Sequence, residues 1–215
     1  MMANHNRSKL SANDVKLSKL LSWLLRHGAE KVGLSLDDGG FVDLDKILKL
    51  DQFQKYSVDD IVRVVEQNDK KRFTLRCKGD KNILQIRANQ GHSLKVDEEG
   101  LLGVLTLDNI PSVIYHGTYF SKIKNIKASG LSRMKRNHIH FTDKFPGEEG
   151  VISGIRNSCE IVIVVDAIKA IKDGFKFYIS DNGVILCSGN AEGLLPSMYF
   201  KEIWQLKPSK KLLSY

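Results

Sequence analysis

Apolar residues near the start of the chain recur with the period of a helix. Five leucines fall at positions i, i+3, i+4, i+7 and i+8: Leu17, Leu20, Leu21, Leu24 and Leu25. That spacing places them on one face of a helix over residues 14–27. Gly28 comes next, and glycine is favoured just past a helix end because it takes positive φ without a Cβ penalty. The pattern predicts a buried helix that ends beside Arg26 and His27.

The remainder of the first half predicts two further helices and a hairpin. Residues 42–50 carry apolar side chains at helical spacing with Asp43 as a suitable N-cap, and Ser57 with Asp60 resembles a capping box. Two alternating segments, 72–77 and 83–87, flank turn residues. Three helices followed by a β-ribbon is the winged-helix layout, whose members bind nucleic acid or protein.

The second half predicts a lobe dominated by β-strands. Residues 161–165 are a continuous β-branched run, which is typical of a buried strand. Segments 175–179 and 184–187 flank Asp181-Asn182-Gly183, which predicts a hairpin with a type I′ turn. Further elements are expected as follows: a strand ending at 114–116, a helix over 121–129 closed by Gly130, and a strand over 199–206. The fold class is therefore α+β.

Composition bears on the kind of partner and the cellular compartment that we expect for this protein. Lys and Arg number 33 against 25 Asp and Glu, and the net charge of +8 suits a polyanionic partner without proving one. Cys77, Cys159 and Cys187 are odd in number, widely separated and outside any metal-binding spacing. We therefore expect reduced thiols in the nucleus or cytoplasm. No apolar run approaches the ~20 residues of a membrane span.

Arg26 and His27 admit two interpretations. They either complement the helix dipole, because carbonyls at a helix C-terminus favour positive charge, or form a pre-positioned anion clamp. Three more islands of cationic and polar residues stand at predicted element ends: Arg87 to Ser93, His116 to Thr118, and Arg136 to His140. His138 and His140 share one face of a strand, but no third ligand is spaced for a metal ion, so we expect none.

These islands, in this order, resemble the tRNA 2′-phosphotransferase family, the NAD-dependent enzymes that finish tRNA splicing. The resemblance extends from Lys16 to Leu206, and the eukaryotic members look most similar. It rests on the following motifs: Leu-Ser-Lys-Leu-Leu-Ser-Trp-Leu-Leu-Arg-His-Gly (17–28), Gly-Phe-Val-Asp-Leu (40–44), Lys-Arg-Phe-Thr-Leu (71–75), Ile-Arg-Ala-Asn-Gln-Gly-His-Ser (86–93), Tyr-His-Gly-Thr (115–118), Arg-x-His-Ile-His (136–140), Pro-Gly-x-x-Gly-Val-Ile-Ser-Gly-Ile-Arg (146–156) and Asn-Gly-Val-Ile-Leu (182–186).

The resemblance implies a two-lobed organisation. We expect a flexible N-terminus over residues 1–14, a winged-helix RNA-binding lobe over 15–98, a linker over 99–109, and an ADP-ribosyltransferase-like NAD-binding lobe of mixed β structure over 110–207. We expect a monomer that binds NAD and an RNA with an internal 2′-phosphate, and no membrane.

The resemblance also implies roles for particular residues. The family's catalytic set corresponds to Arg26, His27, Arg87 and Arg136. The residues expected to contact NAD are His116, Gly117, Thr118, Ser153, Gly154 and Arg156. Gln90, His92 and Ser93 follow Arg87 as a run of hydrogen-bonding groups, and we expect them to bind substrate. All four catalytic residue types are present, which favours the anion clamp at Arg26 and His27.

The implied reaction has two steps. The 2′-phosphate at the splice junction attacks C1″ of the nicotinamide ribose of NAD and expels nicotinamide, giving an RNA 2′-phospho-ADP-ribose intermediate. The ribose 2″-OH then attacks the phosphate, releasing 2′-OH RNA and ADP-ribose 1″,2″-cyclic phosphate. A phosphomonoester carries about −1.5 to −2 charges at pH 7, so arginine forks rather than a general base suit the first step. The residues do not identify the base for the 2″-OH.

Two rival functions remain open from the sequence. One is an ADP-ribosyltransferase acting on terminal nucleic-acid phosphates or on protein; Glu160 and Glu192 are available, but neither lies in a recognised motif. The other is a non-catalytic RNA-binding module with a decayed NAD lobe, which would show lost arginines or a broken His-Gly-Thr.

Overall fold

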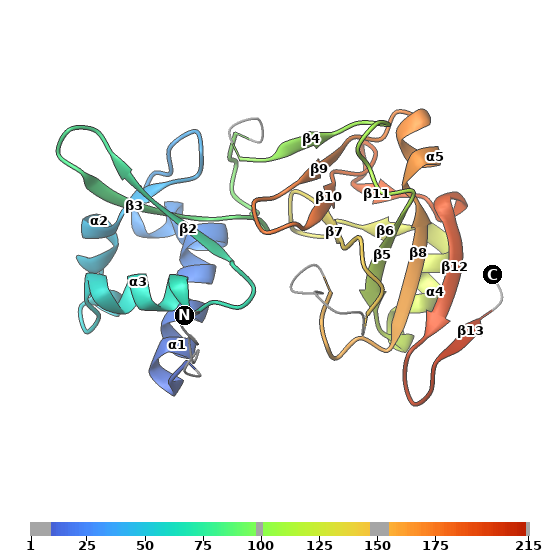
Figure 1. The fold of residues 1–215 in the computed structure, drawn as a ribbon, viewed down its shortest axis with the longest axis horizontal. Coiled ribbons are helices and arrows are strands. Elements are labelled where there is room, and N and C mark those ends of the chain that lie inside the picture. Colours follow the sequence, from blue (N-terminus) through green and yellow to red (C-terminus); the bar gives the residue numbers. More distant parts are fainter. Residues whose placement is uncertain (1–9, 98–100, 147–154, 214–215) are drawn as a thin grey trace, which may run out of the picture. The chain divides into compact units, whose positions relative to one another are not determined.

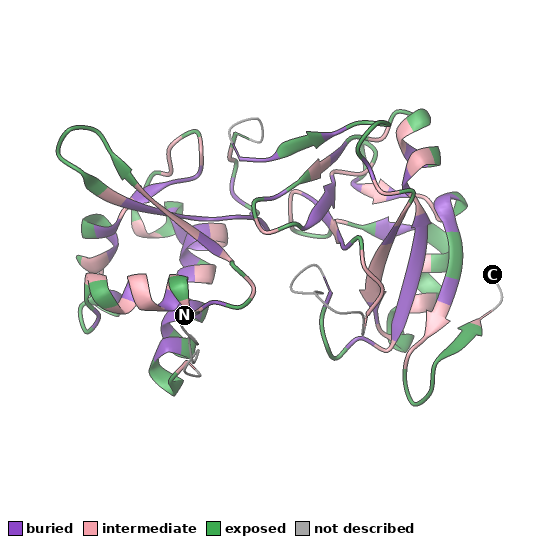
Figure 2. Cartoon of the chain, viewed as in Figure 1, coloured by how far each residue is buried: buried purple, intermediate pink, exposed green. Residues whose placement is uncertain are grey.

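The computed structural model describes residues 10–97, 101–146 and 155–213 of the chain. The chain divides into two compact units, Met1–Leu101 and Leu102–Tyr215, which are drawn in Figure 1. Each unit has a hydrophobic core of its own, as the purple segments of Figure 2 show. Helices and strands are both present, which confirms the α+β class, and the pairs formed between the described strands are antiparallel.

The first unit consists of helices around a small sheet with the strand order β1-β3-β2. Its elements are α1 (Ala12–Trp23), η1 (Leu24–Gly28), η2 (Glu30–Val32), β1 (Val42–Asp43), α2 (Leu44–Leu48), η3 (Asp51–Phe53), α3 (Val58–Glu66), β2 (Phe73–Lys78) and β3 (Ile83–Ala88). The predicted order of three helices and a hairpin is confirmed. Four leucines of the stripe on α1 and η1 are buried in a core with residues such as Ile47, Phe53 and Ile61, and Leu20 packs against it partly buried.

Two expectations for this unit were wrong in detail. The helix begins at Ala12, so part of the segment expected to be flexible is helical, and Asp14 is buried. Asp43 precedes α2, but its side chain does not cap the helix. Its carboxylate instead accepts a hydrogen bond from Gln85 Nε2 (2.6 Å) and pairs with Lys46 (2.9 Å). Asp43 thus ties β1 to the neighbouring strand β3, where its backbone is opposite Gln85.

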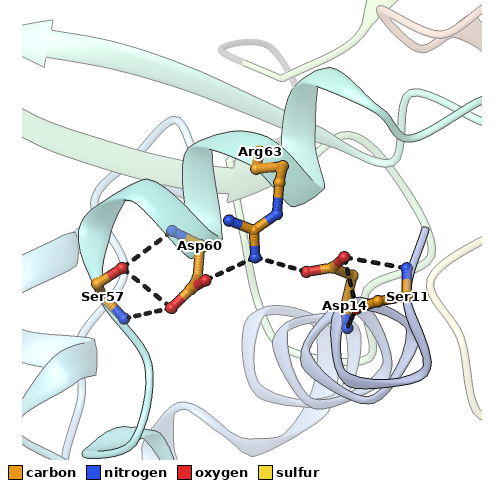
Figure 3. Close-up of polar contacts among 5 residues, drawn as sticks. All are labelled: Ser11, Asp14, Ser57, Asp60 and Arg63. Atoms are coloured by element: carbon orange, nitrogen blue, oxygen red, sulfur yellow. Dashed lines mark hydrogen bonds and ion pairs between the residues drawn. The ribbon is translucent and has the colours of Figure 1, made fainter. Parts of the chain in front are cut away.

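An arginine joins two capping boxes in the first unit (Figure 3). The predicted box of Ser57 and Asp60 is confirmed at α3, and Ser11 with Asp14 forms a second box at α1. Arg63 Nη2 lies 2.8 Å from Asp14 Oδ1 and 2.6 Å from Asp60 Oδ1. The hydrogen bond from Arg63 lowers the pKa of Asp14, and the backbone N–H of Ser57 followed by Arg63 lowers the pKa of Asp60. One side chain therefore fastens α1 to α3.

We expect Asp14→Asn to lower the melting temperature at pH 7 by about 3 °C. A carboxylate with a lowered folded-state pKa stabilises the protein above its unfolded pKa of about 4, and this stabilisation is lost as the pH falls through the folded value. The difference between the parent protein and the variant should therefore shrink between pH 5 and about pH 3. Thermal unfolding followed by circular dichroism measures it. Asp59→Asn, which removes the same charge from an exposed side chain on α3, is the control; a gap that is equal at both pH values would contradict the prediction.

The second unit contains two four-stranded sheets with the strand orders β4-β9-β10-β7 and β13-β12-β8-β5, and a short pair β11-β6. Its elements are β4 (Gly103–Leu105), β5 (Val113–Thr118), α4 (Phe120–Ser129), β6 (Leu131–Ser132), β7 (Ile139–Phe141), β8 (Ile161–Asp166), α5 (Ala167–Lys172), β9 (Phe177–Ile179), β10 (Ile185–Cys187), β11 (Leu194–Leu195), η4 (Ser197–Tyr199), β12 (Phe200–Gln205) and β13 (Lys211–Leu213). The strands expected around 161–165 and 199–206, and the helix closed by Gly130, are confirmed.

The two four-stranded sheets share one core. Phe141 and Phe177 from one sheet and Ile114 and Ile163 from the other belong to the same buried cluster. The backbones of Tyr115 and Thr142 exchange hydrogen bonds of 2.8 and 3.1 Å, which links β5 to the segment after β7. The strand β8 is central in its sheet and buried along its length except at its last residue (Figure 2). This core fixes the ends of β5 and β7, where the candidate site residues of this unit lie.

Two further details differ from expectation. The β9–β10 hairpin is present, but in its turn only Gly183 has positive φ (76°), whereas a type I′ turn requires Asn182 to have it as well. The Ser180 N–H to Val184 O and Gly183 N–H to Ser180 O bonds instead close a longer turn. Residues 103–105, expected within the linker, form β4 and pair with β9.

The three cysteines are described by their burial and the helices by their length and hydropathy. Cys77, Cys159 and Cys187 are all free thiols, as predicted. Burial raises the pKa of the Cys187 thiol to about 11, which keeps it protonated at neutral pH. Among the helices in the described ranges, none is both long and apolar enough to cross a bilayer.

Candidate active site

Arg26 and His27 lie in a π turn rather than at a helix end. After Trp23 the helix widens into the five-residue π segment Leu24–Gly28 and then continues through Ala29, so the positive φ expected at Gly28 is absent. The left-handed residue that ends this stretch is Gly33, with φ of 74°. The Trp23 ring packs directly on Gly28, and a Cβ at residue 28 would lie 2.6 Å from that ring and displace it. Insertions of this kind in helices are frequent at functional sites.

The polar segment after β3 docks on this π turn. The Arg26 carbonyl accepts hydrogen bonds from the backbone N–H groups of Ser93 (2.9 Å) and Leu94 (3.3 Å). His27 Nδ1 is 2.9 Å from Ser93 Oγ. Gly91, with φ of 87°, lies against the Arg26 side chain, because a Cβ there would be 3.5 Å from Arg26 Nε. Two islands 60 residues apart in sequence therefore form one cationic and polar surface in the first unit.

Arg87 is connected to these residues through the turn at residues 37–40. Its side chain is buried at 8% exposure, and its Nη1 donates to the Gly39 carbonyl at 3.2 Å. The guanidinium carbon stands 4.7 Å from the centroid of the Phe41 ring. His92, also buried, faces the same turn, since its Nε2 is 3.9 Å from where a Cβ of Gly40 would lie. Arg26, His27, Arg87, His92 and Ser93 are thus brought together by shared neighbours.

Gln90 and Asn89 complete the buried polar run after β3. Gln90 is 8% exposed and Asn89 is 3% exposed. The Asn89 side chain accepts from Thr74 Oγ1 (2.7 Å) and donates to the Lys71 carbonyl (2.8 Å), where Lys71 has positive φ. Asn89 therefore holds the end of β3 to the start of β2, a role that the motif alone does not reveal. Hydrogen bonds from both ends of the amide offset the free energy that burial of this polar side chain costs.

In the second unit, the His-Gly-Thr motif forms the last half of β5. His116 Nδ1 donates to the His140 carbonyl at 2.9 Å, so its proton is on Nδ1 and Nε2 is an acceptor. Burial lowers the pKa of His116, which outweighs the hydrogen bond to His140, and the imidazole is neutral at pH 7. A Cβ on Gly117 would lie 2.4 Å from Ile155 Cγ1, so packing requires this glycine. Thr118 is buried and its carbonyl accepts from the Glu160 N–H.

Arg136 lies in a loop between β6 and β7 that is closed on itself. Its N–H donates to the Arg133 carbonyl (3.1 Å), and Arg133 Nη1 donates back to the Arg136 carbonyl (2.9 Å). The Arg133 N–H is anchored to the Gly193 carbonyl (2.9 Å). Burial, and then the positive charge of Arg156, lower the pKa of Arg136. A partly desolvated arginine near a second arginine is an arrangement that a bound anion would stabilise.

Tyr119 and Ser158, which the sequence did not single out, interact with each other in the second unit, and Tyr119 also interacts with Arg156. The Tyr119 hydroxyl is 2.8 Å from Ser158 Oγ, and hydrogen bonds with Ser158 and then with Arg156 lower the pKa of Tyr119. Ser153 and Gly154 lie outside the described residues. Within the described ranges no cluster of three or more His, Cys, Asp or Glu side chains is suited to a metal ion. The immediate succession His-Gly-Thr-Tyr was the available sequence signal for Tyr119.

Comparison with known proteins accounts for these motifs. The family "RNA 2′-phosphotransferase, Tpt1 / KptA family" matches residues 12–189. The chain is 47% identical to tRNA 2′-phosphotransferase 1 of Mus musculus over 209 residues, which are 97% of this chain and 84% of that protein. It is 45% identical to tRNA 2′-phosphotransferase 1 of Homo sapiens, with coverage of 97% and 82%. It is 36% identical to tRNA 2′-phosphotransferase of Saccharomyces cerevisiae, with coverage of 93% and 88%. The resemblance inferred from the motifs is confirmed, and the chain belongs to the RNA 2′-phosphotransferase, Tpt1 / KptA family of enzymes.

Proposed function

We propose that this enzyme removes the 2′-phosphate left at the splice junction of ligated tRNA by transferring it to NAD. The products are 2′-OH RNA, nicotinamide and ADP-ribose 1″,2″-cyclic phosphate. NAD is consumed as a co-substrate. The observation that carries the proposal is the docking of residues 91–94 on the π turn, which gathers Arg26, His27 and Ser93 on one surface of the first unit.

In this proposal the first unit is a winged-helix RNA-binding lobe that uses an unusual surface. The third helix of such a module commonly meets nucleic acid. Here α3 exposes Asp59 and Glu66, and its arginine, Arg63, is paired with two aspartates. Acidic side chains repel a phosphate backbone. Contact with the 2′-phosphate therefore falls to Arg26, His27 and Arg87, with Gln90, His92 and Ser93 beside them.

The first step needs orientation and charge rather than a base. The 2′-phosphate arrives ionised, and an arginine fork binds it through two parallel hydrogen bonds. Holding such a nucleophile at near-attack distance is worth effective molarities of ~10⁵–10⁸ M in favourable cases. Arg26 and Arg87 supply the forks, and His27 is held by Ser93. The second unit supplies Arg136, which stabilises charge on phosphorus when the ribose hydroxyl attacks.

Residues of the second unit fit NAD by their chemistry. His116 presents an acceptor nitrogen that a ribose hydroxyl can use, and the Arg156 guanidinium suits a pyrophosphate. NAD supplies the electrophilic ribose carbon. Gly117 and Thr118 have structural roles within the second unit that do not require NAD. His116 and Arg156 are therefore the stronger candidates for direct contact with NAD. Ser153 and Gly154 remain predictions.

The decisive experiment incubates the protein with NAD and an RNA bearing one internal 2′-phosphate. We expect 2′-OH RNA and ADP-ribose 1″,2″-cyclic phosphate in equal amounts, with turnover dependent on NAD, measured by mass spectrometry of both products. Arg26→Ala is the matched negative control. Formation of neither product by the folded protein would overturn the proposal.

One rival function is weakened by a contact in the second unit. A protein-directed ADP-ribosyltransferase commonly relies on a glutamate, but Glu160 Oε2 accepts the Phe120 N–H at 3.0 Å and so serves the first turn of α4. Modification of terminal nucleic-acid phosphates would use the same arginines and gives a distinct result in the assay. A stable ADP-ribosylated RNA end, without the cyclic phosphate, would favour that activity.

A further inference from the structure

Arg87 is held in place by the turn that precedes β1. Its Nη1 donates to the Gly39 carbonyl (3.2 Å), and its guanidinium carbon is 4.7 Å from the centroid of the Phe41 ring. Phe41 is itself buried at 5% exposure. The carbonyl and the aromatic face are both neutral, so these two partners orient the guanidinium without cancelling its charge.

The strand register explains why Phe41 meets Arg87. Val42 pairs with Ile86 and Asp43 with Gln85 in an antiparallel register. Continuing that register by one residue beyond the start of β1 sets Phe41 opposite Arg87 on β3. Residues two apart on a strand point to the same face, so Gln85 and Arg87 share one face of the sheet. The backbone geometry thus places an aromatic ring over a catalytic arginine.

Phe41 is in turn fixed by Asp37. Asp37 Oδ1 accepts from the N–H groups of Gly39 (3.1 Å) and Phe41 (2.8 Å), and the Asp37 N–H donates to the Phe41 carbonyl (2.9 Å). One carboxylate therefore orders both groups that touch Arg87. Its other oxygen, Oδ2, pairs with Arg76, which also lies 3.7 Å from the Phe41 centroid and donates from Nε to Gln85 (2.9 Å).

We infer that Phe41, locked by Asp37, is the positioning residue for Arg87 in the transfer of the 2′-phosphate. The inference rests on the proposed function, because it assumes that Arg87 binds the phosphate. Arginine has many rotamers, and catalysis requires its planar fork at one orientation within about 10–20°. The Phe41 face restricts the guanidinium plane, and the Gly39 carbonyl restricts its rotation within that plane. The Phe41 side chain itself does not contact the reacting atoms in this assignment.

The test compares Phe41→Leu and Phe41→Tyr in the full-length protein with NAD and 2′-phosphorylated RNA. Phe41→Leu should lower kcat about 10- to 100-fold and leave the KM for NAD within twofold. Phe41→Tyr keeps the aromatic face and should stay within about threefold of the parent protein. Phe53→Leu removes a buried ring on η3, in the hydrophobic core of the first unit, and is the stability control. A similar loss of kcat in Phe53→Leu would overturn the inference.

A double-mutant cycle separates positioning from a general structural effect. In an Arg87→Lys background, where no guanidinium remains to be oriented, Phe41→Leu should cost less than threefold. Additive losses would overturn the inference. If Phe41→Leu fails to fold, Asp37→Asn, which keeps the side-chain volume, provides the same comparison and should likewise lower kcat selectively. Failure of the parent protein to turn over the RNA would instead overturn the proposed function, so the two outcomes are distinct.

Discussion

Arg136→Ala is expected to slow the second chemical step about 10²- to 10³-fold, so that RNA carrying ADP-ribose on its 2′-phosphate accumulates. Arg136 is a partly desolvated cation whose pKa is lowered by burial and by the nearby charge of Arg156. A guanidinium in such surroundings interacts strongly with charge that develops on phosphorus. Its loss should therefore affect the step in which the phosphate is attacked more than the step in which the phosphate is the nucleophile.

Single-turnover reactions resolve the two steps by the mobility and mass of the RNA. Lys135→Ala, which removes an exposed cation from the neighbouring position, is the matched control and should not accumulate the modified RNA. Equal slowing of both steps, or loss of RNA binding with no modified RNA, would show that Arg136 acts elsewhere in the reaction. Unchanged thermal unfolding of Arg136→Ala would show that the substitution leaves the stability of the fold intact.

The sequence predicts a structural element correctly where residues close together along the chain determine that element. The capping box of Ser57 and Asp60, the β-branched run at 161–165 and the end of α4 at Gly130 are each indicated by residues that are close together in the sequence. Gly28 was misinterpreted because its constraint is the Trp23 ring packed on it, which a C-cap pattern does not encode. Asp43 was assigned to the helix beside it, whereas its partner Gln85 is 42 residues away.

The candidate site shows the same division. The islands at residues 26–27 and 87–93 were found from the order of the motifs, but the side chains that support them were not. Asp37 and Gly39 lie in the turn before β1, and their relation to Arg87 depends on strand pairing between distant segments. Phe41 stood within the Gly-Phe-Val-Asp-Leu motif, which was the available hint that an aromatic residue matters there.

Gly130→Ala is expected to destabilise the second unit by about 3 kcal/mol or more, which lowers its melting temperature by about 10 °C or more. Gly130 ends α4 with φ of 92° and ψ of −177°, a region of backbone conformation that is essentially restricted to glycine. A Cβ there would also lie 2.3 Å from the Leu195 carbonyl oxygen. That atom belongs to the backbone of β11, which pairs with β6, so it cannot move aside as a side chain would.

Gly174→Ala is the comparison without the steric clash, because Gly174 also has positive φ (93°) and nothing lies within 4 Å of the position of its Cβ. We expect it to cost only about 1 kcal/mol, from backbone strain alone. Equal melting temperatures for the two variants, measured by circular dichroism, would contradict the steric argument. In Gly130→Ala, the clash with Leu195 would displace β11 and its partner strand β6. The loop that carries Arg133 and Arg136 follows β6, and the Arg133 N–H is bonded to Gly193 just before β11. Gly130→Ala should therefore also lower the rate of phosphate transfer below the melting temperature, whereas Gly174→Ala should not.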